Sequence, residues 1–120
     1  IKIIFMYQYK AKLDRVVDGD TVYAMVDLGF HTWVRANIRL YGIDAYESRT
    51  RDLEEKEKGL KATERLKEIL SASDNKFKLK SHGLDKYGRS LGTLLVEPLG
   101  DLNQLLVTEG HAVPYDGGKR

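Results

Sequence analysis

Acidic and cationic side chains gather at three separated turns of this 120-residue chain. A tight acidic turn, Asp18-Gly19-Asp20-Thr21, lies between two alternating apolar runs. A strand-like run containing Arg39 continues into Asp44-Ala45-Tyr46-Glu47, and a distant turn, Asp85-Lys86-Tyr87-Gly88-Arg89, supplies a second arginine. Carboxylate oxygens suit a hard cation such as Ca²⁺, a further carboxylate can act as a base, and arginine forks fit phosphate oxygens. Together these residue types can support attack on a phosphodiester.

Each of these residues also has an ordinary structural explanation. Asp-Gly pairs commonly shape hairpin turns, so Asp18 and Asp20 could serve the bend alone. Arg39 could be a solvated residue on an edge strand, and Arg89 and Glu47 could be surface charges in turns or loops. The three histidines have no metal-ligand spacing and are predicted to be surface or packing residues: His31, His82 and His111. Only the combination of the three turns favours a catalytic role for these residues over a structural one.

Alternation of apolar and polar residues predicts three strands joined by short turns. The runs are Tyr9–Val17, Thr21–Leu28 and His31–Tyr41. Asp18-Gly19 is a strong hairpin signal between the first two, because glycine readily takes the positive φ that tight hairpins need. The sequence therefore predicts a three-stranded meander whose turns carry the acidic residues.

The second half of the chain changes period. The densely charged stretch from Ser48 to Glu57 predicts a mobile loop, in which a frayed helical start is the alternative left open. Apolar residues at helical spacing predict a helix from Lys58 to about Leu70. Gly59 is placed in the first turn of that helix, because an interior glycine costs about 1 kcal/mol relative to alanine. The remaining predicted elements are a strand Lys76–Lys80 with Phe77 and Leu79 inward, a strand Ser90–Val96, and a helix Leu102–Glu109 capped by Asp101 and stopped by Gly110.

The element order predicts a mainly β fold with α elements (α+β). Five strands, with a helix between the third and fourth and a C-terminal helix, have the connectivity of a five-stranded Greek-key barrel, the OB-fold. An open α+β sheet is the alternative that periodicity leaves open. At this length we expect residues 1–120 to form one domain, with a core from about residue 9 to 112.

The composition excludes some classes of protein but does not indicate which partner this chain binds. The chain has no cysteine, which excludes disulfides and cysteine-based zinc sites. Twenty Lys and Arg residues against 18 Asp and Glu give a net charge of +2, which tolerates a polyanionic ligand but does not demand one. The apolar run Ile1–Tyr7 is too short for a signal sequence or a membrane span. We expect a soluble monomer without a membrane partner, either cytoplasmic or secreted.

Three motifs agree in order and spacing with one known family. Val17-Asp18-Gly19-Asp20-Thr21-Val22, Ile38-Arg39-Leu40 followed by Ile43-Asp44-Ala45-Tyr46-Glu47, and Asp85-Lys86-Tyr87-Gly88-Arg89 resemble the staphylococcal nuclease (thermonuclease)-like family. The resemblance runs from Lys12 to Ala112 and includes the Gly59…Ala62 pattern and the strand Lys76–Lys80. Because three separate motifs match, the signal is much stronger than a lone Asp-Gly-Asp-Thr.

The resemblance implies a Ca²⁺-dependent endonuclease that cleaves DNA and/or RNA, prefers single-stranded or frayed substrates, and leaves 3′-phosphate ends. By the same resemblance, Asp20, Asp44 and the backbone carbonyl of Ala45 would bind Ca²⁺. Arg39 and Arg89 would grip the scissile phosphate, and Glu47 would be the general base. The positions implied near the bound nucleotide are Lys86, Tyr87 and, as a candidate for stacking on a base, Tyr115.

The chain departs from the family in the loop that carries the predicted base. It has Asp44-Ala45-Tyr46-Glu47 where the family commonly has Asp-Thr-Pro-Glu. A carbonyl ligand survives the change to Ala45, but a hydroxyl that could orient a water is lost. Tyr46 in place of proline is expected to loosen Glu47. The alternative functions are therefore a non-catalytic OB-fold module that binds nucleic acid or a protein ligand, and a purely structural domain.

Overall fold

The computed structural model describes residues 7–48 and 50–115. The apolar run at the start of the chain lies outside the described residues except for Tyr7, as does the end of the predicted C-terminal loop, residues 116–120. In this part of the chain, neither helix contains a stretch that could span a membrane.

The first three strands form the predicted antiparallel meander. They are β1 (Gln8–Asp18), β2 (Thr21–Gly29) and β3 (Thr32–Leu40). The β1–β2 register shifts between Leu13 and Arg15, which marks an irregularity in β1. Even-numbered residues of β2 and β3 such as Val22, Ala24 and Ile38 are buried, so the odd-numbered residues of these strands form the outer face.

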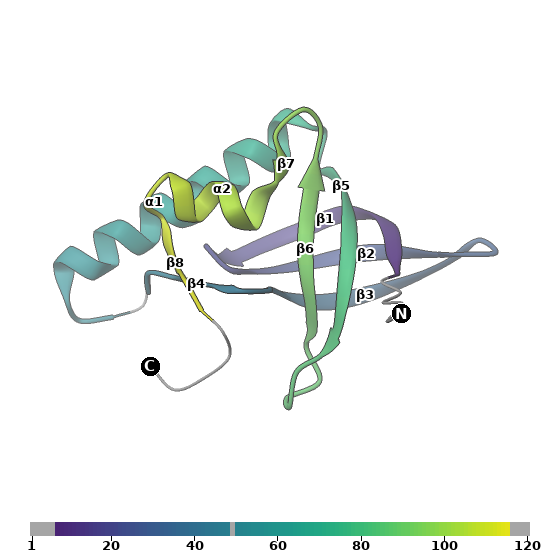
Figure 1. The fold of residues 1–120 in the computed structure, drawn as a ribbon, viewed down its shortest axis with the longest axis horizontal. Coiled ribbons are helices and arrows are strands. Elements are labelled where there is room, and N and C mark those ends of the chain that lie inside the picture. Colours follow the sequence, from purple (N-terminus) through teal and green to yellow (C-terminus); the bar gives the residue numbers. More distant parts are fainter. Residues whose placement is uncertain (1–6, 49, 116–120) are drawn as a thin grey trace, which may run out of the picture.

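Two further strands close the sheet into a barrel (Figure 1). β5 (Lys76–Leu84) pairs with β1, and β6 (Ser90–Val96) pairs with β5 on one side and in parallel with β3 on the other. The strand order β3-β2-β1-β5-β6, joined by the β3–β6 pairing, is a closed five-stranded barrel. The OB-fold prediction is confirmed, and the open-sheet alternative is wrong.

Helix α1 (Leu53–Ala72) begins five residues before the predicted start. The side chain of Asp52 accepts hydrogen bonds from the backbone N–H groups of Glu54 and Glu55, which caps the helix at that residue. The stretch predicted to be a loop therefore contributes the first turn of α1. Gly59 consequently lies in the interior of the helix, not in its first turn, and its position has a steric reason described below.

The C-terminal part adds short elements that periodicity could not reveal. β7 (Gly100–Asp101) extends the sheet beside β6, and α2 (Leu102–Thr108) follows directly, with Asp101 as its cap as predicted. β4 (Ile43–Ala45) pairs with β8 (Ala112–Pro114) in a separate two-stranded sheet beneath the helices (Figure 1). Strands of two or three residues are too short to show an alternating pattern.

One buried asparagine joins α2 to the barrel. Asn103 is 3% exposed; its Oδ1 accepts from Leu94 N (3.2 Å), and its Nδ2 donates to the carbonyls of Tyr41 (2.8 Å) and Gly92 (3.0 Å). The inward residues Phe77 and Leu79 of β5 are buried as predicted. The hydrophobic core is the following set of buried residues: Ala11, Val22, Ala24, Val26, Ile38, Leu40, Ile43, Ala45, Ala62, Leu66, Ile69, Leu70, Phe77, Leu79, Leu94, Val96, Leu102, Leu106 and Ala112.

We expect Asn103→Leu to lower the free energy of unfolding by about 2–4 kcal/mol. The leucine fills a similar volume but leaves the buried N–H of Leu94 and the carbonyl of Tyr41 without this partner, and each unsatisfied group costs roughly 1–3 kcal/mol. Urea unfolding followed by circular dichroism measures the change. The neighbouring exposed variant Gln104→Leu is the control and should stay within about 0.5 kcal/mol of the parent; equal stability of the two variants would contradict the prediction.

Candidate active site

Two carboxylates converge on one arginine at the end of the β2–β3 hairpin. The register places Thr21 opposite Arg39, which brings the neighbouring Asp20 beside the guanidinium. Arg39 Nη1 lies 3.0 Å from Asp20 Oδ2, and Arg39 Nη2 lies 3.6 Å from Asp44 Oδ1. The three side chains are only 13–14% exposed, so their charges interact more strongly than they would in bulk water.

Asp20 is fixed by hydrogen bonds as well as by the ion pair. Its Oδ2 accepts from Ala45 N (2.9 Å) and its Oδ1 accepts from the Thr21 hydroxyl (3.0 Å). The Ala45 bond spans 25 residues and ties β4 to the β1–β2 turn. Asp18 serves the bend itself, since its Oδ1 lies 3.4 Å from the N–H of Asp20. The two acids of the turn therefore have separate positions, one shaping the turn and one facing the arginine.

Small residues allow the acidic turn, β4 and α1 to meet. A Cβ placed on Gly19 would lie 2.7 Å from the Cβ of Ala62 and 2.9 Å from the Cβ of Ala45. These distances are shorter than real Cβ contacts, so only glycine fits there without movement. The close approach holds the Asp20 turn and the Asp44–Ala45 strand against the same face of the helix.

Glu47 follows β4 on an exposed loop whose backbone rests against α1. A Cβ on Gly59 would lie 2.5 Å from the carbonyl oxygen of Glu47, so the helix approaches this peptide as closely as a glycine permits. Beside it, the ammonium of Lys58 lies 5.1 Å from the ring centroid of Tyr46. Helix α1 therefore packs against the Glu47 peptide through Gly59. The looser Glu47 expected from Tyr46 stays a prediction.

The donor set near Arg39 fits a hard cation. Asp20, Asp44 and the adjacent backbone offer oxygen ligands only, which is the chemistry that Ca²⁺ accepts. Within the described residues no group of three or more His, Cys, Asp or Glu side chains could hold a metal ion. A cation at Asp20 and Asp44 would therefore complete its shell with backbone oxygen and water, as Ca²⁺ sites with six to eight ligands commonly do.

The second predicted arginine belongs to the loop between β5 and β6. Arg89 Nε donates to Asp85 Oδ2 (2.7 Å), and Asp85 Oδ1 accepts from the backbone N–H groups of Tyr87 and Arg89 (both 2.8 Å). Desolvation raises the pKa of Asp85, but these hydrogen bonds and the charge of Arg89 outweigh it and bring the pKa below its ordinary value. Asp85 is therefore an anion that holds Arg89 in one orientation.

The exposed ring of Tyr87 lies between two cations of the same loop. The Lys86 ammonium is 5.3 Å and the Arg89 guanidinium carbon 5.7 Å from its centroid. Arg89 directly precedes Ser90, which pairs with Ile38 across the parallel β3–β6 seam, and Leu91 pairs with Arg39. The loop thus ends beside the strand that carries Arg39, which places both arginines along one seam.

Tyr115 lies next to Arg39 on the other side. Its backbone N–H donates to the carbonyl of Gly42 (2.8 Å), and a small cavity of about 80 Å³ is lined by Arg39, Tyr115 and Tyr41 among others. Tyr41 stacks on His82 with centroids 4.0 Å apart and planes at 7°. Burial and the charge of Lys80 lower the pKa of His82, which favours the neutral ring. His82 thus packs against Tyr41, and its Nε2 lies 2.9 Å from the Thr93 hydroxyl.

The structure thus brings most of the predicted residues to one end of the barrel. Asp20, Arg39, Asp44 and Ala45 form one contact cluster, and Tyr115 adjoins it. Lys86, Tyr87 and Arg89 share the β5–β6 loop, and Glu47 occupies the loop held by α1. Tyr41 had no predicted role, and Gly59 was predicted in the wrong turn of the helix. A glycine inside a helical pattern often marks a packing contact, and that was the signal available for Gly59.

Comparison with known proteins agrees with this arrangement. Residues 37–119 match the family described as staphylococcal nuclease homologue (SNase). Endonuclease YhcR of Bacillus subtilis (strain 168) is 35% identical over 114 residues, a match that covers 90% of this chain and 9% of that protein. The chain therefore spans less than a tenth of the length of this curated relative. Since the family match covers more than half of the sequence and the barrel has the predicted topology, the chain belongs to the staphylococcal nuclease homologue family.

Proposed function

We propose that this chain is a Ca²⁺-dependent nuclease that hydrolyses phosphodiester bonds of DNA and/or RNA and leaves 3′-phosphate ends. The observation that carries the proposal is the convergence of Asp20 and Asp44 on Arg39 at one partly buried point of the barrel. Family membership and the endonuclease name of the Bacillus subtilis relative support the same reaction class. All the residues assigned to the reaction come from one chain, so we infer that a monomer suffices.

The residues divide the chemistry among them. Asp20, Asp44 and the Ala45 carbonyl would hold Ca²⁺, which would supply positive charge to offset the phosphate. Glu47 takes a proton from water, the water oxygen attacks phosphorus, and the bond to the 5′-oxygen breaks. The forks of Arg39 and Arg89 donate to the phosphoryl oxygens as negative charge builds there. No side chain is assigned as the acid that protonates the leaving oxygen.

Aromatic and cationic residues beside the arginines would guide the strand. Tyr87 and Tyr115 offer rings on which bases can stack, and Lys86 adds a charge for the backbone. Stacking of bases on aromatic rings tolerates every sequence and needs unpaired bases. We therefore infer a preference for single-stranded or frayed DNA or RNA.

Cleavage is expected to require Ca²⁺. Denatured DNA and single-stranded RNA are incubated with the protein in Ca²⁺ or in EDTA, and the products are separated on a gel. EDTA should abolish cleavage and added Ca²⁺ should restore it, because two carboxylates and an arginine alone leave the phosphate charge poorly balanced. The variant Asp20→Asn should lose Ca²⁺ binding by calorimetry, whereas Asp14→Asn, an exposed variant in β1, should keep it.

The outcomes separate the competing functions. Equal cleavage in EDTA would remove the metal from the proposal. Binding of nucleic acid without any Ca²⁺-dependent cleavage would instead identify a binding module, and neither binding nor cleavage would identify a structural domain.

A further inference from the structure

Five lysines form a ladder on the outer face of the barrel, away from the predicted motifs. Lys10 and Lys12 lie on β1, and the alternating residues Lys76, Lys78 and Lys80 lie on β5. The antiparallel register sets Lys10 directly opposite Lys78 and Lys12 directly opposite Lys76. We call these five residues the lysine ladder.

The lysine ladder is not explained by stability. Like charges directly opposite each other destabilise a strand pair. Lys76 lies 3.7 Å from Asp74, but the other four lysines make no ion pair with any residue in the ranges 7–48 and 50–115. The chain as a whole has a net charge of only +2, so five lysines gathered here form a local positive patch that could attract an anionic partner.

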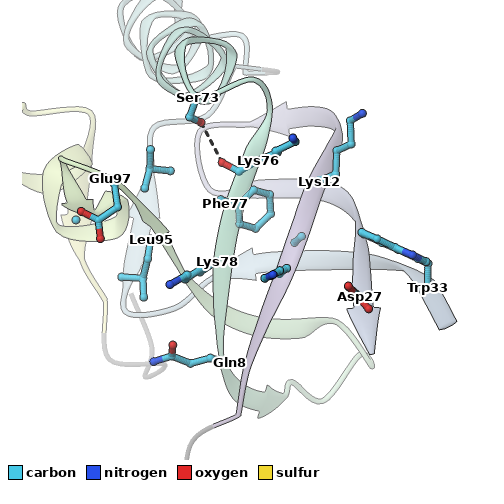
Figure 2. A pocket seen from close by; sticks show the side chains of 14 residues that line it. Gln8, Lys12, Asp27, Trp33, Ser73, Lys76, Phe77, Lys78, Leu95 and Glu97 are labelled. Carbon is cyan, nitrogen blue, oxygen red and sulfur yellow. Dashed lines mark hydrogen bonds between the residues drawn. The ribbon is translucent and has the colours of Figure 1, made fainter. Parts of the chain in front are cut away.

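The lysine ladder borders a groove with an aromatic end. The groove has a volume of about 750 Å³ and is lined by four of the lysines, by Trp33 and Phe77, and by the acids Asp27 and Glu97. Figure 2 shows Trp33 and Asp27 at one end of the groove and Glu97 at the other, with Lys12, Lys76 and Lys78 along it. Trp33 is 49% exposed, and Asp27 is engaged with the N–H of Gly29 (2.8 Å).

The strand register continues this face toward the candidate active site. Lys76, Lys12, Met25 and Arg35 are successive cross-strand neighbours over β5, β1, β2 and β3. On β3 the outer face carries Trp33 and Arg35 and, further along, Arg39, six residues from Trp33 and so about 20 Å away at the usual rise of a strand. The groove and the arginine of the candidate active site therefore lie on one continuous face.

A cluster of Tyr23, Arg15 and Arg35, called here the Tyr23 cluster, lies on this face between the groove and Arg39. The guanidinium carbons of Arg35 and Arg15 lie 4.2 Å and 5.6 Å from the ring centroid of Tyr23. Arg35 also pairs with Asp14 at 2.8 Å, so one of the two guanidinium groups is partly neutralised. Alternation of cations with aromatic rings is the arrangement that binds single-stranded nucleic acid without sequence preference.

We propose that the lysine ladder, Trp33 and the Tyr23 cluster form a track for the phosphate backbone of single-stranded nucleic acid, leading across the barrel to Arg39. The inference rests on the proposed nuclease function and extends it from the cleavage point to a distant binding surface. A hollow groove with an exposed tryptophan fits a flexible strand with stacking bases better than a flat lipid surface. A track of this length implies that long strands bind better than short ones.

The test compares two double variants that each remove two positive charges. Lys10→Gln with Lys78→Gln removes a facing pair of the lysine ladder, and Lys61→Gln with Lys67→Gln removes two exposed lysines of α1 as the matched control. Binding of a fluorescent 16-nucleotide single strand is measured by anisotropy in EDTA between 50 and 300 mM salt. The ladder variant should bind roughly tenfold more weakly at 0.1 M salt and lower the salt slope by about 1.4, twice the value of about 0.7 per phosphate contact. The control should match the parent.

A second measurement tests whether the lysine ladder contributes to cleavage as well as to binding. With Ca²⁺, the ladder variant should lose kcat/KM on the long strand by the same factor and keep the parent's rate on a dinucleotide, which is too short to reach the lysine ladder. Equal weakening by both double variants, or unchanged binding by the ladder variant, would overturn the proposal. So would binding of the lysine ladder to vesicles of anionic phospholipid in preference to the oligonucleotide. Because the binding arm needs no cleavage, an inactive protein that still binds through the lysine ladder would refute the nuclease function and leave the track standing.

Discussion

Glu47→Gln is expected to lower kcat for phosphodiester cleavage by about 10²–10⁴-fold, the usual contribution of a positioned general base. The amide keeps the size and hydrogen-bonding reach of the side chain but cannot take a proton from water. The side chain is exposed, so the substitution should leave folding unchanged. Single-turnover cleavage of a labelled oligonucleotide, together with anisotropy binding, separates the chemical step from affinity.

Because Glu47→Gln also removes a negative charge near the substrate, a second variant must control for the loss of charge alone. Glu54→Gln, on an exposed position in the first turn of α1, removes the same charge and should cleave at close to the parent's rate. Binding of the oligonucleotide by Glu47→Gln should equal or exceed that of the parent, since a repulsive charge has been removed. Turnover by Glu47→Gln at the parent's rate would take this residue out of the base role while leaving the arginines and carboxylates in theirs.

Gly59→Ala is expected to impair cleavage from a position inside a helix. In an ordinary helix interior alanine would gain about 1 kcal/mol over glycine. Here the added Cβ would meet the backbone of Glu47 and Ser48, with the carbonyl oxygen at 2.5 Å, so either the loop or the helix must move. Overpacking of this kind costs typically about 1–3 kcal/mol, and a misplacement of about 1 Å at a catalytic group can cost about 10²-fold in rate.

Kinetics and unfolding together test whether Gly59 positions the base. The variant should lose kcat by about 10–10²-fold with KM little changed, because the loop of Glu47 moves while the substrate surfaces stay in place. Lys56→Ala, an exposed position on the same helix, is the control and should keep both parameters. A Gly59→Ala protein that is more stable than the parent and fully active would contradict the steric role of this contact.

The residues of the carboxylate–arginine cluster are brought together by tertiary contacts and are not neighbours in the sequence. Asp20 and Arg39 meet because the β2–β3 register sets Thr21 opposite Arg39. Asp44 meets them because β4 turns back after Gly42 and its Ala45 N–H reaches the Asp20 carboxylate. Each contact is between residues 5 to 25 positions apart, so spacing along the chain alone could not show that these side chains meet.

The fold was largely predictable because its strands alternate cleanly. β6 and the capped start of α2 agree with the prediction to the residue, and β1, β2 and β3 differ from it by one residue at most at each end. Before Lys58 only a frayed helical start was left open as an alternative, because the first turn of α1 is charged and exposed and carries no apolar period. The cap at Asp52 is the local signal for the true start. β4 and β8 were missed because pairing between three-residue strands depends on the tertiary structure.

The sequence by itself determined the class of the barrel and the residue types available for chemistry, because period and turn residues are local properties of the chain. Only the tertiary structure decided that the Asp20 carboxylate lies 3.0 Å from the Arg39 guanidinium. It also decided that Gly59 is a contact point for the Glu47 loop, and that five scattered lysines and Trp33 share a face with Arg39. The physical reason is that strand register and helix packing join residues far apart in sequence, and neither leaves a mark on any single segment.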